Sequence, residues 1–302
     1  MRLVKVCYKI KYSLEKVLGV EVRDKFFELL ITWYYRIFRE RKHGVSLENK
    51  RKRKVIVSMT SIPSRIDKVW ITIESLLRQT YKPDKIILWL GEDEFRNVKL
   101  PKRLKKKQKR GLKICYCEDL RSYTKFYYTA KQYPDDYIVT VDDDIIYAED
   151  MLEIMVRTYK ENPGCVICNR SHQIKTYCGG LRTYDKWTKY KERENIENGP
   201  SFNNFFTGVG GNLLPMFMMD KIVLDKKNFL EMAPYADDVW LNFCAWISGI
   251  KTVNTKGILG YLITIESSAA KGLSEVNVTY RRNDEQIERV LKHLGIDINQ
   301  YL

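Results

Sequence analysis

The sequence has no apolar run approaching the ~20 residues that an α-helix needs to cross a bilayer. It contains neither a G-x-G-x-x-G loop nor a Walker-type phosphate loop, so a dinucleotide-dependent redox enzyme and a P-loop ATPase have little support. The N-terminal segment mixes charges throughout and offers no small-residue cleavage site, so we expect no signal peptide. Internal repeats and low-complexity segments are also absent. These absences favour an ordinary globular protein.

The seven cysteines are odd in number and lie mostly in apolar, strand-like runs, which fits a reduced cytosolic compartment. Two spacings, Cys115-x-Cys117 and Cys165-x-x-Cys168 with His172 nearby, invite a zinc interpretation. Both pairs fall on expected strands and lack the turn residues of zinc knuckles, so we do not favour zinc.

The net charge of +15 is distributed unevenly over the 302 residues. The first 54 residues hold 16 Lys or Arg against 6 Asp or Glu, which is +10 of that total. Such a balance suggests an anionic partner: nucleic acid, a membrane surface or a phosphorylated substrate. Concentration of charge at the N-terminus argues against a broad nucleic-acid groove in the body. A second basic run, 99–113, is expected to be a solvated helix face or loop.

Residues 1–45 are expected to form basic helices with many apolar and aromatic positions. One interpretation is a segment that lies on an anionic membrane surface, with basic side chains at the headgroups and the apolar face in the interface. The other is a helical appendage packed on the body or on a partner. Both interpretations remain open at this point.

From residue 55 onward, short β-branched runs alternate with helical patterns. Ser64 is expected to cap the first helix of this part. Strands are expected at 55–59, 85–90, 112–117, 137–141 and 165–168, and helices at 66–77, 122–132, 151–159 and 239–247. This order predicts an α/β fold with a mostly parallel sheet and helices on both faces. Ligands bind such sheets beyond the carboxyl ends of the strands.

Asp142, Asp143 and Asp144 follow one of these strand patterns directly. Three adjacent anions repel one another, and burying one of them unpaired is costly, so a cation is a natural companion. Oxygen ligands favour Mg²⁺ or Mn²⁺. If the extended conformation continued, Asp142 and Asp144 would share one side as a D-x-D pair. A solvated turn before the next helix is the alternative.

Four ordered motifs now make a recognisable set: the run 57–65, the aspartates 142–144, the glycine loop 208–211 and the run 237–240. In this order they resemble bacterial glycosyltransferases of the GT-A fold, of the family-2-like group that builds surface polysaccharides. The resemblance covers about residues 54–285. The expected organisation is a basic amphipathic helical extension at 1–50, a GT-A domain at 51–265, and a C-terminal mobile loop and helix at 266–302. The resemblance also implies transfer of a sugar from a nucleoside diphosphate donor to an acceptor hydroxyl.

The resemblance assigns roles to the aspartates and to the first strand. Asp144 would be the direct ligand of Mn²⁺ or Mg²⁺, and Asp142 would face the ribose or reach the metal through water. Asp143 would be a supporting or structural residue close to the donor. The residues expected to line the nucleotide pocket at the first strand's end are Thr60, Ser61, Pro63 and Arg65.

Two further donor contacts follow from the same resemblance. Lys125, near a helix N-terminus, would contact the donor, and a cation there suits a phosphate; an ordinary surface lysine is the alternative. Asp119 would hydrogen-bond the nucleotide base, and its alternative is a helix cap. Gly210 and Gly211 permit φ > 0 and a close backbone approach, either for a sugar-binding loop or for a tight turn.

The acceptor hydroxyl needs a base, because its proton leaves as the new bond forms. Asp238 is the first candidate and Asp237 the second. Both stand at the start of an expected helix, so an N-cap and a first-turn partner of the helix dipole form the alternative. Residues 267–283 lack a core pattern and suggest a lid over the donor.

The expected donor is a nucleotide sugar, most simply a UDP-sugar, and the expected acceptor is a glycan or lipid-linked glycan. Direct displacement predicts an inverting reaction. The expected location is cytoplasmic and peripheral, at the inner face of the plasma membrane. A sugar nucleotidyltransferase and a catalytically degenerate binding protein are the alternatives; the first usually carries a glycine-rich phosphate loop, and residues 58–65 contain no glycine.

Overall fold

A computed structural model describes residues 2–18, 24–48, 51–188, 199–255, 257, 262–265 and 282–302. The helices are α1 Leu3–Leu18, α2 Asp24–Ile37, α3 Val69–Leu77, α4 Glu92–Phe95, α5 Lys102–Lys107, α6 Thr124–Gln132, α7 Met151–Glu161, α8 Lys226–Met232, α9 Asp237–Ile247 and α11 Arg282–Leu294. The strands are β1 Val55–Thr60, β2 Lys85–Gly91, β3 Leu112–Cys117, β4 Tyr137–Thr140, β5 Val166–Cys168, β6 Ser171–Gln173, β7 Thr176–Tyr177, β8 Gly180–Leu181, β9 Asn204–Phe206, β10 Asn212–Pro215 and β11 Thr252–Asn254.

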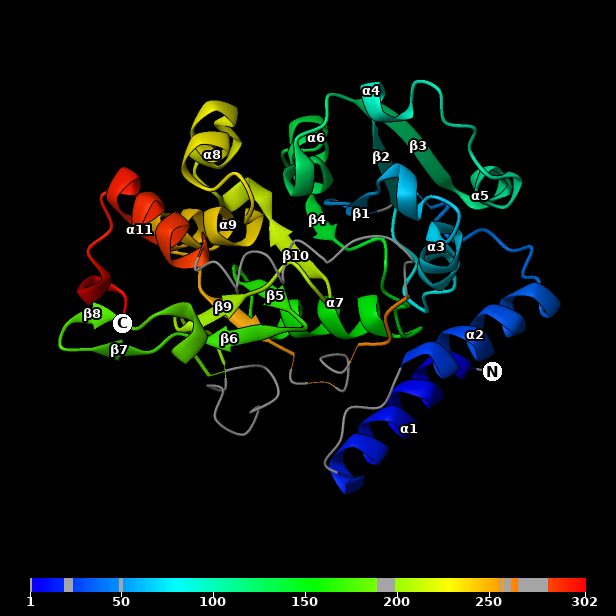
Figure 1. Ribbon diagram of the computed structural model, residues 1–302, viewed down its shortest axis with the longest axis horizontal. Coiled ribbons are helices and arrows are strands. Elements are labelled where there is room, and N and C mark those ends of the chain that lie inside the picture. The colour runs from blue at the N-terminus through cyan, green and yellow to red at the C-terminus, as the bar shows by residue number, and fades with distance from the viewer. Residues whose placement is uncertain are drawn as a thin grey trace.

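The centre of the protein is a seven-stranded sheet in the order β11-β5-β10-β4-β1-β2-β3 (Figure 1). All neighbouring strands are parallel except β10, which runs antiparallel to both β4 and β5. The predicted mostly parallel sheet is therefore confirmed, and the reversed β10 was not predicted. Because β1 and β4 are adjacent and parallel, the segments that follow them meet at one edge of the sheet.

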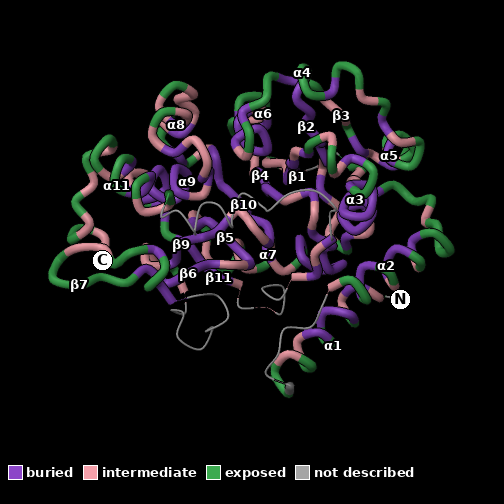
Figure 2. The backbone as a smooth tube through the Cα atoms, viewed as in Figure 1, coloured by how far each residue is buried: buried purple, intermediate pink, exposed green. Residues whose placement is uncertain are grey.

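Helices cover both faces of the sheet, as predicted, and each face has its own apolar cluster. Val57 of β1 and Val139 of β4 belong to the cluster that includes α3 and α7. Ile138 of β4 points to the opposite cluster, which includes α6 and α9. This alternation of neighbouring residues between faces is the period-2 pattern of a strand buried on both sides. Both β1 and β4 are mostly buried along their length (Figure 2).

Local details differ from the sequence predictions in two places. Ser64 does not cap α3, because a 3₁₀ turn at Pro63–Arg65 intervenes and the N-cap of α3 is Lys68. The basic run 99–113 is only partly solvated, since Arg110 is buried and both Lys107 and Arg110 bind the buried carboxylate of Glu74. Charge alone could not show that a distant acid would draw these two side chains inward.

The N-terminal helices α1 and α2 are packed on the body. Tyr8 and Ile31 are fully buried in the same apolar cluster as α3 and the sheet. Tyr8 also donates a hydrogen bond through Oη to the carbonyl oxygen of Ile146, at 2.8 Å. The predicted helices are thus present, and one side of the pair belongs to the protein's own core. Across the described residues, no helix combines the length and apolarity needed to span a membrane.

All seven cysteines are free thiols. At the C-terminal end, α11 packs against α9 and contributes Ile287 and Val290 to the second cluster. The predicted lid, 267–283, lies almost entirely outside the described residues.

Candidate active site

The aspartate motif forms a turn beyond β4, since the strand ends at Thr140 and Asp143 and Asp144 occupy turn positions. The strand alternation assumed for a D-x-D pair therefore does not continue through the motif. Asp143 is buried, accepts a hydrogen bond from Ser61 Oγ at 2.5 Å, and pairs with Arg65 Nη1 at 2.8 Å. The segment after β1 thus holds this turn in place, with Asp143 as its anchor.

Arg65 also reaches Asp144, with 3.0 Å between Nη1 and Oδ2. Asp144 is about a third exposed, at 32% of its side chain. Burial and then the neighbouring charge of Asp142 raise the pKa of Asp144 to about 6. The two carboxylates therefore repel each other in spite of Arg65, and a divalent cation between them would relieve that repulsion.

Lys125 connects the aspartate turn to the other predicted carboxylates. Its Nζ lies 3.0 Å from Asp142 Oδ1 and 3.3 Å from Asp237 Oδ2, and the residue is buried. Burial lowers the pKa of Lys125, but the charges of Asp142 and Asp237 more than compensate and raise it above its ordinary value. The surface-lysine alternative is therefore wrong, because Lys125 is a buried cation shared between two acids.

Asp237 and Asp238 are the first two residues of α9, whose N-cap is Ala236. The N-cap alternative is wrong for both, although they do lie in the first turn, where the helix dipole favours negative charge. Burial and then the charge of Asp237 raise the pKa of Asp238 to about 7. Asp238 accepts the backbone N–H of Val239 at 3.0 Å. A half-buried carboxylate with a pKa near neutrality is suited to accept a proton.

The glycine loop adjoins this pair. Gly210 and Gly211 adopt φ of 98° and 96°, in the left-handed region where glycine is favoured. Asn169 Nδ2 donates to the carbonyl oxygen of Gly210 at 2.9 Å and so holds the loop. A Cβ on Gly208 would come within 3.1 Å of Lys125 Nζ, so glycine leaves room for the buried ammonium. The turn geometry is confirmed, and a contact with sugar stays a prediction.

The remaining predicted donor contacts lie at the ends of β1 and β3. Asp119 Oδ1 accepts the backbone N–H of Arg121 at 2.9 Å and the hydroxyl of Thr124 at 3.3 Å. The helix-cap alternative is therefore wrong for Asp119, because the N-caps of the next 3₁₀ turn and of α6 are Leu120 and Tyr123, and neither helix start has a side-chain cap. The contact of Asp119 with the nucleotide base stays a prediction. Thr60 Oγ1 donates to the carbonyl oxygen of Trp89 at 3.1 Å, and Pro63 starts the 3₁₀ turn that carries Arg65.

A divalent cation fits this site only in company with the donor. Among the described residues, no three His, Cys, Asp or Glu side chains gather into a set that could hold a metal ion. Two carboxylates, Asp142 and Asp144, are nevertheless what Mg²⁺ or Mn²⁺ typically takes from a protein when substrate phosphates and water complete the shell. The chemistry of this donor set therefore suits an ion shared with a diphosphate.

Sequence reasoning missed two supporting residues, Tyr147 and Asn169, and it missed the role of Gly208 beside Lys125. The backbone N–H of Asp142 donates to Tyr147 Oη at 2.9 Å, which fixes the start of the aspartate turn. Tyr147 stands five residues after Asp142, in a stretch with no regular periodicity, so no pattern could have indicated it. Gly208 belonged to a recognised loop, but its role depends on Lys125, which is distant in sequence.

Two clusters of acids, joined by one buried lysine at the carboxyl edge of a mostly parallel sheet, define a glycosyltransferase when combined with the sequence comparison. The model of Glycosyl transferase family 2 matches residues 64–224, more than half of the chain. The protein belongs to that family. The match includes Arg65, the aspartate turn, Lys125 and the glycine loop, and it ends before Asp237.

Similarity at the level of solved structures is low in sequence. The mannosyltransferase PcManGT from Pyrobaculum calidifontis, in complex with GDP-Man and Mn²⁺, aligns with 96% of this chain and 76% of its own, at 12% identity and a TM-score of 0.48. No curated protein sequence matches the chain.

Proposed function

We propose that the protein transfers a sugar from a nucleoside diphosphate sugar to an acceptor hydroxyl, with a divalent cation and with inversion at the anomeric carbon. The observation that carries this proposal is the position of Lys125 between Asp142 and Asp237. Asp142 is expected to serve the donor, and Asp237 stands beside the acid expected to serve the acceptor. Because the ammonium group of Lys125 contacts both, the two halves of the site lie next to each other. Membership of Glycosyl transferase family 2 supports glycosyl transfer as the reaction.

On the donor side, the residues stabilise negative charge. When bound at Asp142 and Asp144, Mn²⁺ or Mg²⁺ would supply Lewis-acid stabilisation of the diphosphate leaving group. Arg65 lies against Asp143 and Asp144, so its guanidinium is positioned beside the same phosphates. Thr60, Ser61, Pro63 and Asp119 are proposed to line the nucleotide pocket, and Gly210 and Gly211 to bring backbone close to the sugar.

On the acceptor side, Asp238 accepts the proton of the attacking hydroxyl. The pKa of about 7 means that Asp238 is basic enough to take this proton and still largely ionised above neutral pH. Asp237 holds Lys125 instead, and so orients the cation between the two halves. Direct displacement by the hydroxyl inverts the anomeric centre.

The proposed substrates complete this assignment. We propose a UDP-sugar as donor and a glycan or lipid-linked glycan as acceptor, in surface polysaccharide synthesis at the inner face of a bacterial plasma membrane. A panel of nucleotide sugars, assayed for nucleoside diphosphate release with and without acceptor glycans, tests donor and reaction together. Formation of a nucleoside triphosphate and a sugar 1-phosphate when pyrophosphate is added would instead indicate a sugar nucleotidyltransferase, and no turnover of any donor would indicate a binding protein.

Metal dependence gives a direct test of the aspartate turn. We expect chelation to abolish transfer and Mn²⁺ to restore it, and Asp144→Asn to lower kcat by roughly 10²–10³-fold at a fixed Mn²⁺ concentration, the range seen for removal of one transition-state charge stabiliser. Mn²⁺ titration of activity should show weaker apparent binding in the variant. The exposed Asp93→Asn serves as the matched control and should behave as the parent. Equal activity of Asp144→Asn and the parent would contradict the metal assignment.

A further inference from the structure

The outward faces of α1 and α2 are apolar, although both helices already bury their other faces in the core. The exposed apolar residues of α1 are Val6, Ile10, Leu14 and Val17, and those of α2 are Phe26, Leu29, Trp33 and Ile37. They recur every three or four residues, so each helix presents an apolar stripe. Trp33 is 59% exposed and Phe26 is 68% exposed, which is unusual for large side chains in a protein with a complete core beneath them.

The acidic side chains of these two helices, as far as the structure describes them, turn inward. Asp24 and Glu15 both pair with the buried ammonium of Lys11, and Glu28 is buried and pairs with Lys68. Most of the basic side chains are exposed, in contrast to Lys11, which is buried, and Lys5, which pairs with Asp150. The exposed ones in 2–18 and 24–42 are Arg2, Lys9, Lys16, Lys25, Arg36, Arg39, Arg41 and Lys42. The outer surface is therefore apolar and cationic, a distinction that sequence composition alone does not make.

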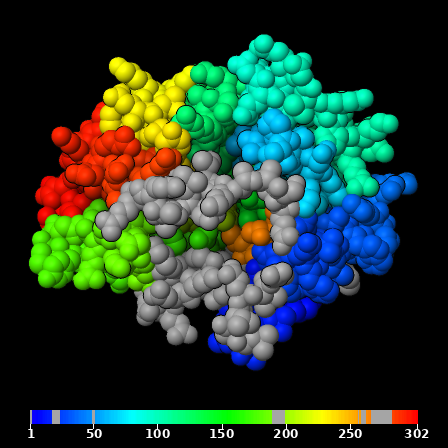
Figure 3. Space-filling view, viewed as in Figure 1, coloured from blue at the N-terminus to red at the C-terminus, as the bar shows by residue number. Residues whose placement is uncertain are grey.

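An apolar and cationic surface fits an anionic bilayer better than it fits nucleic acid. Nucleic acid would contact the basic side chains through phosphates and leave Phe26, Leu29 and Trp33 in water. A bilayer interface takes both kinds of group, since lysines and arginines attract anionic headgroups while apolar side chains enter the boundary with the acyl chains. In the space-filling view the N-terminal helices lie at one corner of the molecule (Figure 3).

These helices are also attached directly to the segment that follows the aspartate turn. Glu149 accepts the backbone N–H groups of Val4 at 3.0 Å and Lys5 at 2.8 Å, so a buried carboxylate fixes the N-terminus of α1. Tyr8, which also lies on α1, donates a hydrogen bond to the carbonyl oxygen of Ile146. A membrane bound to α1 and α2 would therefore be held close to the residues that carry Asp142–Asp144.

We propose that the exposed faces of α1 and α2 form a membrane-docking surface for an anionic bilayer, with Phe26, Leu29 and Trp33 inserted at the interface and Lys9, Arg36 and Arg41 at the headgroups. The docking does not depend on the reaction proposed above. It gives the enzyme a lipid surface on which an acceptor carried by a membrane lipid would be presented.

The test is sedimentation of the full chain with vesicles of phosphatidylcholine, with and without phosphatidylglycerol. We expect binding only when phosphatidylglycerol is present. The tryptophan emission should shift to shorter wavelength on binding, and Trp33→Gln, which keeps the other five of the six tryptophans, should lack this shift. Leu29→Gln with Trp33→Gln should weaken binding about tenfold or more, because two large apolar groups no longer leave water. Lys9→Gln, Arg36→Gln and Arg41→Gln should each weaken it roughly fivefold.

All five substituted side chains are exposed, so the variants should unfold at the same temperature as the parent, which a melting curve verifies. Tyr177→Gln, which removes an equally exposed ring on β7, is the matched control and should bind as the parent does. The proposal is overturned if the parent ignores phosphatidylglycerol vesicles, or if Leu29→Gln with Trp33→Gln binds them equally well. It is also overturned if the stripe instead mediates dimers, seen as a change in mass by light scattering, or salt-sensitive binding of DNA.

Discussion

Replacing Asp238 with asparagine is expected to lower kcat by about 10²–10⁴-fold, the usual contribution of a positioned general base. The amide keeps the size of the side chain and can still accept the N–H of Val239, but it cannot take a proton. KM for the donor should change little, since Asp238 is proposed to act on the acceptor. Initial rates over a range of donor concentrations, at saturating acceptor, measure both kcat and the KM for the donor.

The same carboxyl sets the expected pH dependence. Since Asp238 must be ionised to act, the parent's kcat/KM for the acceptor should rise with pH through about 7, and this limb should be missing in the residual activity of Asp238→Asn. Ionisation of Asp238 should raise activity, but it should lower the stability of the fold. A pKa raised in the folded state means that the native protein binds the proton more tightly than the unfolded chain does. The carboxylate therefore destabilises the fold as pH rises toward 7, and Asp238→Asn should melt at a higher temperature than the parent at pH 8.

Asp237→Asn is the matched control for this pair. Asp237 is the partner of Lys125, so its replacement should lower the melting temperature, whereas replacement of Asp238 should raise it. If Asp238 is the base, the pH limb should persist in Asp237→Asn but move to lower pH, because the charge of Asp237 helps to raise the pKa of Asp238. If Asp237→Asn loses the limb and Asp238→Asn retains it, the two assignments must be exchanged; if both variants work as the parent does, neither residue is the base.

Much of the fold follows from periodicity and strand composition. The β-branched runs at 55–59 and 137–141 are central strands, and their apolar residues on both faces predicted helices on both sides. The direction of β10 was not predictable, because Asn212–Pro215 has no signal that distinguishes a parallel from an antiparallel neighbour. The connection from β5 to β10 contains a small sheet of β6 and β9.

The candidate site was predictable residue by residue but not as an arrangement. Repulsion among adjacent carboxylates indicated that Asp142–Asp144 need cations, and the structure supplies Arg65 and Lys125. No local pattern could show that Lys125 would also reach Asp237, 112 positions away along the chain. Its burial comes from the packing of α6 against the sheet and α9, which is decided by contacts distant in sequence. Lys107 and Arg110 give a second example, because their basic run predicts solvated side chains, whereas in the structure both bind the buried carboxylate of Glu74.

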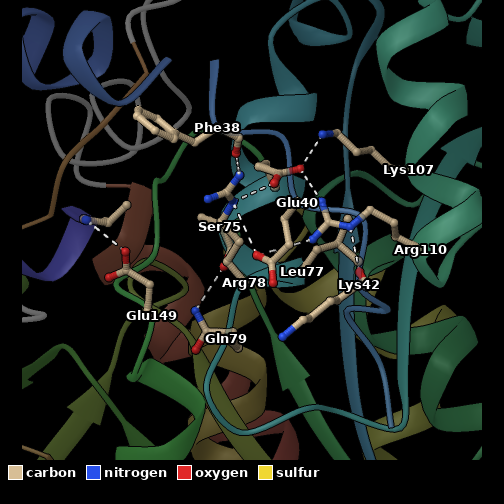
Figure 4. Close-up of polar contacts among 12 residues, drawn as sticks. Phe38, Glu40, Lys42, Ser75, Leu77, Arg78, Gln79, Lys107, Arg110 and Glu149 are labelled. Carbon is tan, nitrogen blue, oxygen red and sulfur yellow. Dashed lines mark hydrogen bonds and ion pairs between the residues drawn. The ribbon is translucent and has the colours of Figure 1, made fainter. Parts of the chain in front are cut away.

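The largest effect on stability is expected from Glu74→Gln, which should lower the free energy of unfolding by about 3–5 kcal/mol, the usual consequence of leaving buried charges without their partner. Glu74 is 2% exposed and accepts hydrogen bonds from Arg78 Nε at 2.6 Å, Arg110 Nη1 at 2.7 Å and Lys107 Nζ. Figure 4 shows Lys107 and Arg110, from one stretch of the chain, converging with Arg78 from the end of α3. Glutamine keeps the shape, but the three cations then repel one another in a buried site.

The damage should extend to the N-terminal extension, because these cations also hold it. Arg78 donates to the carbonyl oxygen of Phe38, and Arg110 Nε donates to that of Lys42 at 2.9 Å. We therefore expect amide exchange in 38–44 to quicken in Glu74→Gln beyond the effect on the sheet. Denaturant unfolding measures the change in the free energy of unfolding of the whole protein, and hydrogen exchange measures the faster local opening of 38–44. Glu231→Gln, an exposed carboxylate on α8, should stay within about 0.5 kcal/mol of the parent.

Acid provides the decisive comparison. Burial alone would raise the pKa of Glu74, but the charges of Lys107 and Arg110 and the hydrogen bonds from Lys107 and Arg78 lower it below its ordinary value. A pKa lowered in the folded state gives stability that is present above the unfolded pKa and disappears as pH falls through the folded one. The difference between the parent and Glu74→Gln should therefore be full at neutral pH and shrink in strong acid, where the parent's Glu74 also becomes neutral. A difference that stayed constant down to the acid limit would mean that the shape of the site matters and that its charge does not.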